Sequence, residues 1–149
     1  KCTRMTVSKS EFSNNHDGIL LNHGSAYNMI IENILKNNEQ GGIEIAYGNG
    51  HDNHISRNRI NENGARGVYL NDAYHNHITN NMFYDNGKKA TKNNMQAAEV
   101  LIDGKSSGNV VDYNIFKTDH TYNFKYTIYS SKEAGSNHLL NNRMEYSKP

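Results

Sequence analysis

The sequence predicts an all-β solenoid of about six stacked coils, forming one domain over residues 1–149. Three observations predict this fold class. A unit of asparagine and aliphatic residues recurs along the chain, its segments alternate apolar and polar residues with period two, and 25 of the 149 residues are asparagine. No stretch shows a sustained helical period, so helices are not expected.

The repeated unit places asparagines and apolar residues at fixed spacing, and three copies are clear. They read Asn28-x-Ile30-x-x-Asn33-x-Leu35-x-x-Asn38, Asn53-x-Ile55-x-x-Asn58-x-Ile60-x-x-Asn63 and Asn76-x-Ile78-x-x-Asn81-x-Phe83-x-x-Asn86. Weaker copies carry the same marker aliphatic residue at Val7, Val111 and Leu139. The marker advances by 23, 25, 23, 33 and 28 residues, and six copies in one register indicate stacked coils.

Each coil is expected to contain three short strands. Two lie within the repeated unit, and the third follows the closing asparagine, at residues 18–21, 42–45, 67–70, 99–102 and, less clearly, 127–130. These segments are three to five residues long and alternate in polarity, which is typical of strands. A narrow stacked core needs few apolar residues, so the hydrophobic fraction of 35% is compatible with folding.

The asparagines fall into turn columns. One column is Asn33, Asn58, Asn81, Asn114 and Asn142, and another is Asn15, Asn38, Asn63 and Asn86. A side-chain amide can both donate to and accept from its counterpart in the next coil, so we expect asparagine ladders. Asparagine also tolerates the left-handed backbone of a tight turn. Sugar contact is the alternative role for these side chains, and the ladder interpretation is favoured.

The remaining composition narrows the class of protein. The net charge of +1 gives no reason to expect nucleic-acid binding, and no apolar run is long enough to span a membrane. Near-zero charge, one proline and 14 tyrosine and phenylalanine residues argue against disorder. The single cysteine, Cys2, permits neither an internal disulfide nor a cysteine-based metal site.

This pattern resembles the right-handed parallel β-helix superfamily, the pectate-lyase-like folds, from about Val7 to Met144. The superfamily includes polysaccharide lyases, polygalacturonase-like hydrolases, mannuronan epimerases, bacteriophage tailspikes and members that only bind. The resemblance implies that the strand beginning Gly-Ile is the first strand of each coil and lines a substrate groove. It implies an extracellular location, secreted or on a phage virion. Fold alone does not settle the activity.

Two coils are longer than the others, at the same place in the repeat. The extra residues lie between Asn86 and Glu99 and between Asp119 and Thr127, and insertions in a solenoid form loops, often on the binding face. They carry the candidate substrate-binding residues Lys88, Lys89, Lys92, Tyr122 and Lys125. Outward residues of the first strand, Glu44 and Tyr69, are further candidates. The basic side chains favour an acidic glycan, although a solvated loop without ligand fits as well.

Candidate catalytic residues lie at the exit of the first strand. Asp72 and Asp103 belong to adjacent coils about 4.8 Å apart, with Lys105 close by. Paired carboxylates serve acid–base hydrolysis or bind Ca²⁺. Lys105 could instead remove the proton beside a sugar carboxylate that Arg66 neutralises, as in a lyase. Ordinary exposed strand residues remain the alternative for each of these four, and no cofactor is required.

The signatures of two catalytic families are missing. The segment 47–52 lacks the Asp-Pro-His motif of the epimerases, and no Asn-Thr-Asp or Gly-His-Gly motif of polygalacturonases is present. Among eight histidines, His54, His77 and His138 are expected to form an outward column and not a metal site. His51 and His75 lie in turns near this column, and only this arrangement warrants a test for metal binding.

Two functions therefore remain open. The first is a polysaccharide lyase or depolymerase acting on an acidic glycan. The second is a non-catalytic carbohydrate-binding module or structural shaft of a tailspike or surface protein. Neither end shows a capping helix, and open terminal coils would aggregate. We therefore expect the chain to be a fragment of a longer protein, or to be covered by partner subunits as in trimeric tailspikes.

Overall fold

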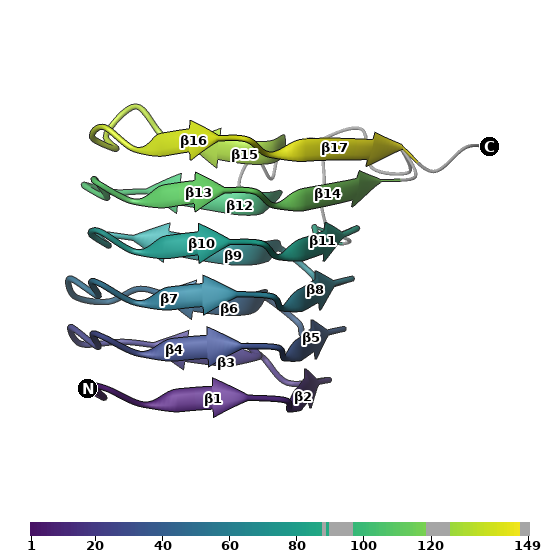
Figure 1. Ribbon diagram of the computed structural model, residues 1–149, viewed down its shortest axis with the longest axis horizontal. Helices are drawn as coiled ribbons and strands as arrows, with labels where there is room; N and C mark the ends of the chain where they lie inside the picture. The colour runs from purple at the N-terminus through teal and green to yellow at the C-terminus, as the bar shows by residue number, and fades with distance from the viewer. Residues whose placement is uncertain (88, 90–96, 119–125, 147–149) are drawn as a thin grey trace.

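The computed structural model describes residues 1–87, 89, 97–118 and 126–146. Within these ranges the strands are short and pair in parallel, and no helix is long and apolar enough to cross a membrane. The coils lie one above another, with the N-terminal coil at the bottom of Figure 1 and the C-terminal coil at the top. The all-β solenoid and its approximate coil number are confirmed, with sheets of six, six and five strands.

Three parallel sheets run along the stack (Figure 1). The first sheet contains β3 (Ile19–Leu21), β6 (Gly41–Ile45), β9 (Arg66–Asn71), β12 (Ala98–Asp103) and β15 (Tyr126–Ser130). The second contains β1 (Thr6–Ser8), β4 (Met29–Ile31), β7 (His54–Ser56), β10 (His77–Thr79), β13 (Val110–Asp112) and β16 (His138–Leu140). The third contains β2 (Glu11–Ser13), β5 (Ile34–Lys36), β8 (Arg59–Asn61), β11 (Met82–Tyr84), β14 (Ile115–Thr118) and β17 (Arg143–Tyr146).

The core is a column of aliphatic and aromatic side chains between the sheets. Equivalent residues of successive coils pair in register, so Ile30 lies opposite Ile55 and Leu35 lies opposite Ile60. Two phenylalanines, Phe83 and Phe116, stack with ring centroids 5.0 Å apart. Both are essentially inaccessible to solvent. Burying such side chains supplies the main stabilisation, because each coil covers the apolar face of its neighbour.

Asparagine ladders connect the turns, and there are three of them in the described part of the chain. In the one that contains Asn58, its Oδ1 accepts from the backbone N–H and from Nδ2 of Asn33, at 2.9 and 3.1 Å. Asn58 Nδ2 donates in turn to Oδ1 of Asn81 at 3.0 Å. The second ladder is Asn38, Asn63 and Asn86, and the third is Asn28, Asn53, Asn76, Asn109 and Asn137. The ladder prediction is confirmed, with one more column than expected.

The left-handed backbone lies one residue earlier than the sequence suggested. The ladder asparagines do not have positive φ; the preceding residues do, including Glu32 (59°), Arg57 (54°) and Glu62 (59°). The reason is that a ladder side chain must point along the stack into the turn, while the residue before it reverses the chain and points outward. The turn therefore accepts charged residues at the left-handed position, although they adopt this conformation less readily than asparagine.

The C-terminal coil exposes side chains that continue the core columns. Leu139, opposite Val111, is 41% exposed, and Met144, opposite Phe116, is 38% exposed. Exposed strand edges with apolar side chains favour association. That partner subunits or further chain cover this end stays a prediction.

Candidate functional site

The outward face of the first sheet carries the sequence-predicted binding residues, but it is not a plain exposed surface. Glu44, Tyr69 and Leu101 occupy one column in register. Their neighbours along the strands point into the core, so these three point outward. Glu44 is nevertheless only 5% exposed and Leu101 is fully buried, while Tyr69 is half-buried. The outward side chains of this face are therefore largely shielded from solvent.

Arg66 joins Glu44 and Tyr69 into a cluster, which we call the face cluster. Nη1 of Arg66 donates to Oε1 of Glu44 at 3.1 Å, and the guanidinium carbon lies 4.2 Å from the centroid of the Tyr69 ring. A Cβ at position 41 would lie 2.8 Å from Oε1 of Glu44. Glycine at 41 therefore leaves the space that the carboxylate occupies. Arg66 was predicted separately as a catalytic residue, and the structure places it with Glu44 and Tyr69, which were predicted to bind substrate.

Burial sets the ionisation of this cluster. It raises the pKa of the Glu44 carboxyl, and the positive charge of Arg66 opposes that shift without cancelling it. Burial also raises the pKa of the Tyr69 hydroxyl, and the charge of Asp103 adds to the effect. Tyr69 is therefore neutral at physiological pH and offers a hydroxyl as hydrogen-bond donor.

The structure gives Asp72 a partner in the next coil. Its Oδ1 accepts a hydrogen bond from the backbone N–H of Lys105 at 2.8 Å, and a Cβ at Gly104 would lie 2.6 Å from the same oxygen. Asp72 thus holds the turn that follows β12. Asp103 is the last residue of β12 and lies opposite Asn71, and the exposed Lys105 lies in the turn beyond it. The acid–base pair of Asp72 and Asp103 stays a prediction from the sequence.

The expected basic wall falls mainly on residues that the structure does not describe. Lys88, Lys92, Tyr122 and Lys125 lie outside the described residues. Lys89 is described, and its Nζ lies 3.6 Å from Oε1 of Glu39. Both side chains are more than half exposed, so this ion pair contributes little to stability.

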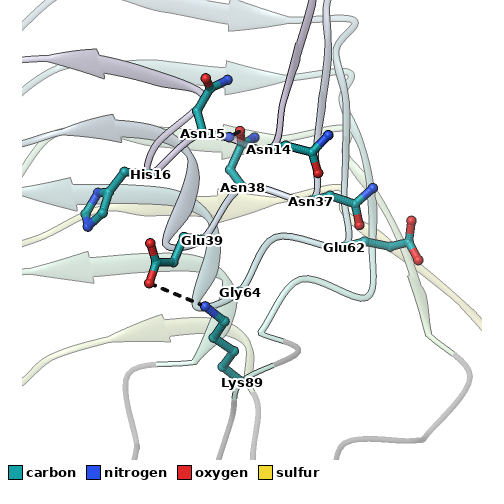
Figure 2. Close-up of a pocket in the computed structure, with 9 residues that line it drawn as sticks. All are labelled: Asn14, Asn15, His16, Asn37, Asn38, Glu39, Glu62, Gly64 and Lys89. Carbon is teal, nitrogen blue, oxygen red and sulfur yellow. Dashed lines mark hydrogen bonds and ion pairs between the residues drawn. The ribbon is translucent and has the colours of Figure 1, made fainter.

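Lys89 lines an open pocket of about 440 Å³ beside the face cluster, which we call the amide pocket. It lies where the turns after the third-sheet strands stack, just before the strands of the first sheet begin. Its lining residues come from four successive coils: Asn14, Asn15 and His16; Asn37, Asn38 and Glu39; Glu62 and Gly64; and Lys89 (Figure 2). The volume lies within the range of small-ligand sites.

The walls of the amide pocket are tied together by the backbone. Glu39 N–H donates to the carbonyl of Asn15 at 2.7 Å, and Gly64 N–H donates to that of Asn38 at 2.9 Å. Lys89 N–H donates to the carbonyl of Gly64 at 2.8 Å. A Cβ at position 64 would lie 1.9 Å from the carbonyl oxygen of Glu39, so only glycine allows the coils to approach this closely. These backbone contacts therefore hold neighbouring turns of the pocket close together.

The pocket adjoins the face cluster through Asp17. Its Oδ1 accepts from the N–H of Gly41, the residue opposite Arg66, and its Oδ2 lies 3.0 Å from Nδ1 of His16. This contact with Asp17 raises the pKa of His16, and the charges of Glu39 and Glu44 add to the shift. An extended ligand could therefore contact both features.

The histidine column lies where the sequence placed it. His54 and His77 are paired in register on the second sheet, with ring centroids 6.2 Å apart, and Val110 separates His77 from His138. His51 pairs with Asp52 at 2.8 Å. In the described part of the chain, no group of three or more histidine, cysteine, aspartate and glutamate side chains is placed to hold a metal ion. Calcium binding by Asp72 and Asp103 stays a prediction from the sequence.

Sequence reasoning missed most of the amide pocket. Asn15 and Asn38 were interpreted as turn and ladder positions, and Lys89 was predicted to bind substrate from the insertion. His16 and Glu39 carried no motif. The available signal was the stacking itself, because side chains in one turn column of successive coils form a continuous surface. Nothing in the sequence indicated that this column would be hollow.

Comparison with known proteins supports the fold. No curated protein matches the sequence significantly. Among solved structures, the chain is similar to the surface protein and adhesin PfbA of Streptococcus pneumoniae, with a TM-score of 0.53 and 11% identity. The similarity covers 97% of this chain and 65% of that one, so this chain spans less than two thirds of that protein's length. At this identity the likeness concerns the fold alone.

A family model gives the assignment. The model of the right-handed β-helix region matches residues 1–148, nearly the whole sequence. Its coverage agrees with the parallel sheets and asparagine ladders described above. The chain belongs to the right-handed β-helix family.

Proposed function

We propose that this β-helix is a non-catalytic carbohydrate-binding module that acts at an extracellular surface, with its ligand on the face cluster. The observation that carries the proposal is the state of Arg66. One nitrogen of its guanidinium is paired with Glu44, but among the described residues no acceptor lies within hydrogen-bond distance of the buried Nε. A buried donor without an acceptor is costly, and a ligand oxygen would relieve that cost.

The chemistry of the cluster suits a sugar. The Arg66 guanidinium and the Tyr69 hydroxyl donate hydrogen bonds, while the Glu44 carboxylate accepts them, so adjacent hydroxyls of a sugar ring find partners of both kinds. The half-buried ring of Tyr69 adds apolar contact. All three side chains project from strands, which hold them more rigidly than loops would.

The extracellular location rests on the structural neighbour. PfbA is a surface protein and adhesin, and a binding role at a surface is the coarse feature that we extend to this chain. Binding without catalysis is favoured because Arg66 is paired with Glu44 and Asp72 holds a backbone turn. Two of the four groups expected to perform chemistry, Arg66 and Asp72, therefore have structural partners.

An enzyme of the lyase or depolymerase type is the second candidate, acting on an acidic glycan. Arg66 also favours it, because a guanidinium can neutralise the carboxylate of a uronate and so ease removal of the neighbouring proton. The two candidates predict different results in a product assay. A lyase releases unsaturated uronates that absorb ultraviolet light, whereas a binding module releases nothing.

The test is electrophoresis of the purified chain in gels that contain neutral, amine-bearing or acidic polysaccharides, together with an ultraviolet assay for unsaturated products. We expect retardation by at least one glycan and no product. Arg66→Ala should weaken binding about tenfold. The matched control is Arg57→Ala, because Arg57 also pairs with a glutamate, Glu32, but lies at an exposed turn. Equal weakening by both variants, or retardation by none of the glycans, would refute the proposal, and an ultraviolet product would favour the enzyme.

A further inference from the structure

Three asparagines of the sequence are followed directly by glycine: Asn49, Asn63 and Asn86. In such a pair the backbone nitrogen of the glycine can attack the side-chain amide carbon of the asparagine, because glycine has no Cβ to hinder the approach. The attack releases ammonia and leaves a carboxylate in place of the amide, which is a covalent modification that needs no enzyme. The three pairs are alike in sequence, and the structure distinguishes them.

The amides of Asn63 and Asn86 are held within a ladder, and both residues are fully buried. Asn63 Nδ2 donates to the carbonyl of Leu35 at 3.1 Å and to Oδ1 of Asn86 at 2.7 Å. Asn86 Nδ2 donates to the carbonyl of Ile60 at 2.8 Å and to Oε2 of Glu99 at 2.6 Å. Either amide would have to break these buried bonds before its carbon could react.

The glycine nitrogens of these two pairs are bonded as well. Gly64 N–H donates to the carbonyl of Asn38 at 2.9 Å, and Gly87 N–H donates to that of Asn63 at 2.8 Å. A nitrogen that points to the preceding coil cannot turn toward the amide of its own neighbour. Reaction at either pair therefore requires the stacked coils to separate.

Asn49 lies at the corner between the first and second sheets, in a longer turn. Five residues lie between Ile45 and His51, against three between the equivalent Leu70 and Tyr74 of the next coil. The extra length leaves the Asn49 side chain exposed to solvent. This asparagine belongs to none of the ladders.

Both reacting groups of the third pair lack hydrogen bonds. Among the described residues, neither the Asn49 side chain nor the Gly50 N–H has a partner. Gly50 is buried, so the turn must move to expose its nitrogen, and no bond at that nitrogen opposes the movement. Bonds to the preceding coil anchor the turn on both sides, at the Tyr47 carbonyl (3.1 Å) and the His51 N–H (3.2 Å). The turn can therefore rearrange without opening a ladder.

Exposure and a left-handed backbone are not sufficient, as Asn80 shows. It is exposed and has φ of 57°, against 56° for Asn49. The residue that follows Asn80 is a ladder asparagine, Asn81, whose N–H donates to Oδ1 of Asn114 at 2.9 Å. Asn80 therefore has no available nucleophile, whereas Asn49 has the nitrogen of Gly50.

We propose that Asn49 is a site of spontaneous deamidation in the folded protein. The Gly50 nitrogen loses its proton to hydroxide and bonds to Cγ of Asn49, the Cγ–Nδ2 bond breaks, and Nδ2 takes a proton from water and leaves as ammonia. Water then opens the cyclic imide at either carbonyl carbon, which gives aspartate or isoaspartate. The formal net charge falls by one, from +1 to zero. This inference does not depend on carbohydrate binding.

Peptide mass spectrometry of the full chain tests the proposal. Trypsin cleaves after lysine and arginine, so the three pairs fall in separate peptides, 37–57, 60–66 and 67–88. After incubation in mildly alkaline buffer, we expect the mass shift of deamidation in peptide 37–57 of the folded chain, and in all three peptides of a sample kept in urea. Asn63 and Asn86 should react at least about tenfold more slowly in the folded chain than in urea, because the coils must open first.

The control variant is Asn49→Gly, which removes the amide and keeps the left-handed turn. It should abolish the mass shift of peptide 37–57 in the folded chain. A shift that persists in this variant would assign the reaction to another asparagine of the peptide and overturn the proposal. So would reaction of Asn63 or Asn86 in the folded chain at the rate of Asn49, or an Asn49 that reacts only in urea.

Discussion

The carboxylate of Glu99 occupies the place that an asparagine amide holds in the preceding coils. Its Oε2 accepts a hydrogen bond from Nδ2 of Asn86 at 2.6 Å, and the backbone N–H of Asn86 points to the same oxygen at 3.4 Å. Asn63 makes the same two contacts to Oδ1 of Asn86. Glu99 lies opposite Gly67, so a glutamate at a glycine position ends this ladder where the chain is longest between coils.

Replacing Glu99 by alanine should therefore destabilise the fold. Both donors of Asn86 would be buried without this acceptor, and each unmatched buried group costs about 1–3 kcal/mol. Glu99→Gln keeps a carbonyl acceptor and should lose less. The free energy of unfolding, from urea titration followed by circular dichroism, measures the difference. Glu133→Ala, at an exposed position, is the control. If Glu99→Ala lowers the free energy of unfolding no more than Glu133→Ala does, the ladder-ending role is contradicted.

Replacing an asparagine in the middle of a ladder should lower the free energy of unfolding more. Asn58→Ala removes the acceptor for two donors of Asn33 and the donor to the carbonyl of Ile30, at 2.8 Å. We expect a loss of about 3 kcal/mol or more in the free energy of unfolding, since several buried groups lose a partner together. Asn141→Gly, at an exposed left-handed turn position, should change stability only slightly. Similar losses for the two variants would mean that the ladders contribute little.

The raised pKa of Glu44 predicts a pH dependence of stability. Because burial holds the folded-state pKa above the ordinary value, the folded chain binds the proton more tightly than the unfolded chain. The contribution of Glu44 is therefore fully present below the unfolded pKa and is lost as pH rises through the folded one. Glu44→Gln should remove this fall, as measured by melting temperature across a pH series starting near 4. Parallel pH profiles for the two proteins would contradict the shift.

His54 should produce the opposite slope. Burial first, and then the charges of His77 and Arg57, lower the pKa of its imidazole, so the unfolded chain binds the proton more tightly. The contribution of His54 is present above the unfolded pKa of about 6.5 and is lost as pH falls through the lower folded value. His54→Gln should reduce the loss of stability on acidification to about pH 5, measured by urea titration at each pH. His138→Gln, on the exposed C-terminal coil, should leave that loss unchanged.

The sequence predicted the fold well because the ladders and the core columns are local patterns repeated in one register. Ile30, Ile55 and Ile78 could be aligned by eye, and they pair as expected. The exact place of the left-handed residue was wrong, since spacing alone does not distinguish a ladder asparagine from the residue before it. The exchange of Gly67 for Glu99 one coil later was visible in the sequence, but its partner Asn86 could not be inferred without the packing.

The candidate site was predicted only in part. Glu44 and Tyr69 were recognised as outward residues, but their burial and their link through Arg66 depend on side-chain conformations that a strand pattern does not specify. The amide pocket arises from the relative depth of stacked turns, at Gly64 above all. Such depth depends on the contact between neighbouring coils and has no sequence signature.

The ladders also give the solenoid an electrical direction. In each rung between two asparagines, one Nδ2 hydrogen donates to Oδ1 in the next coil toward the C-terminus, as from Asn28 to Asn53 and from Asn109 to Asn137. The other donates to a backbone carbonyl of the preceding coil, as from Asn58 to Ile30. Amide dipoles aligned in series reinforce one another, as peptide dipoles do in a helix. The stack is therefore directional: each ladder carbonyl faces the N-terminal side and accepts from the coil before it.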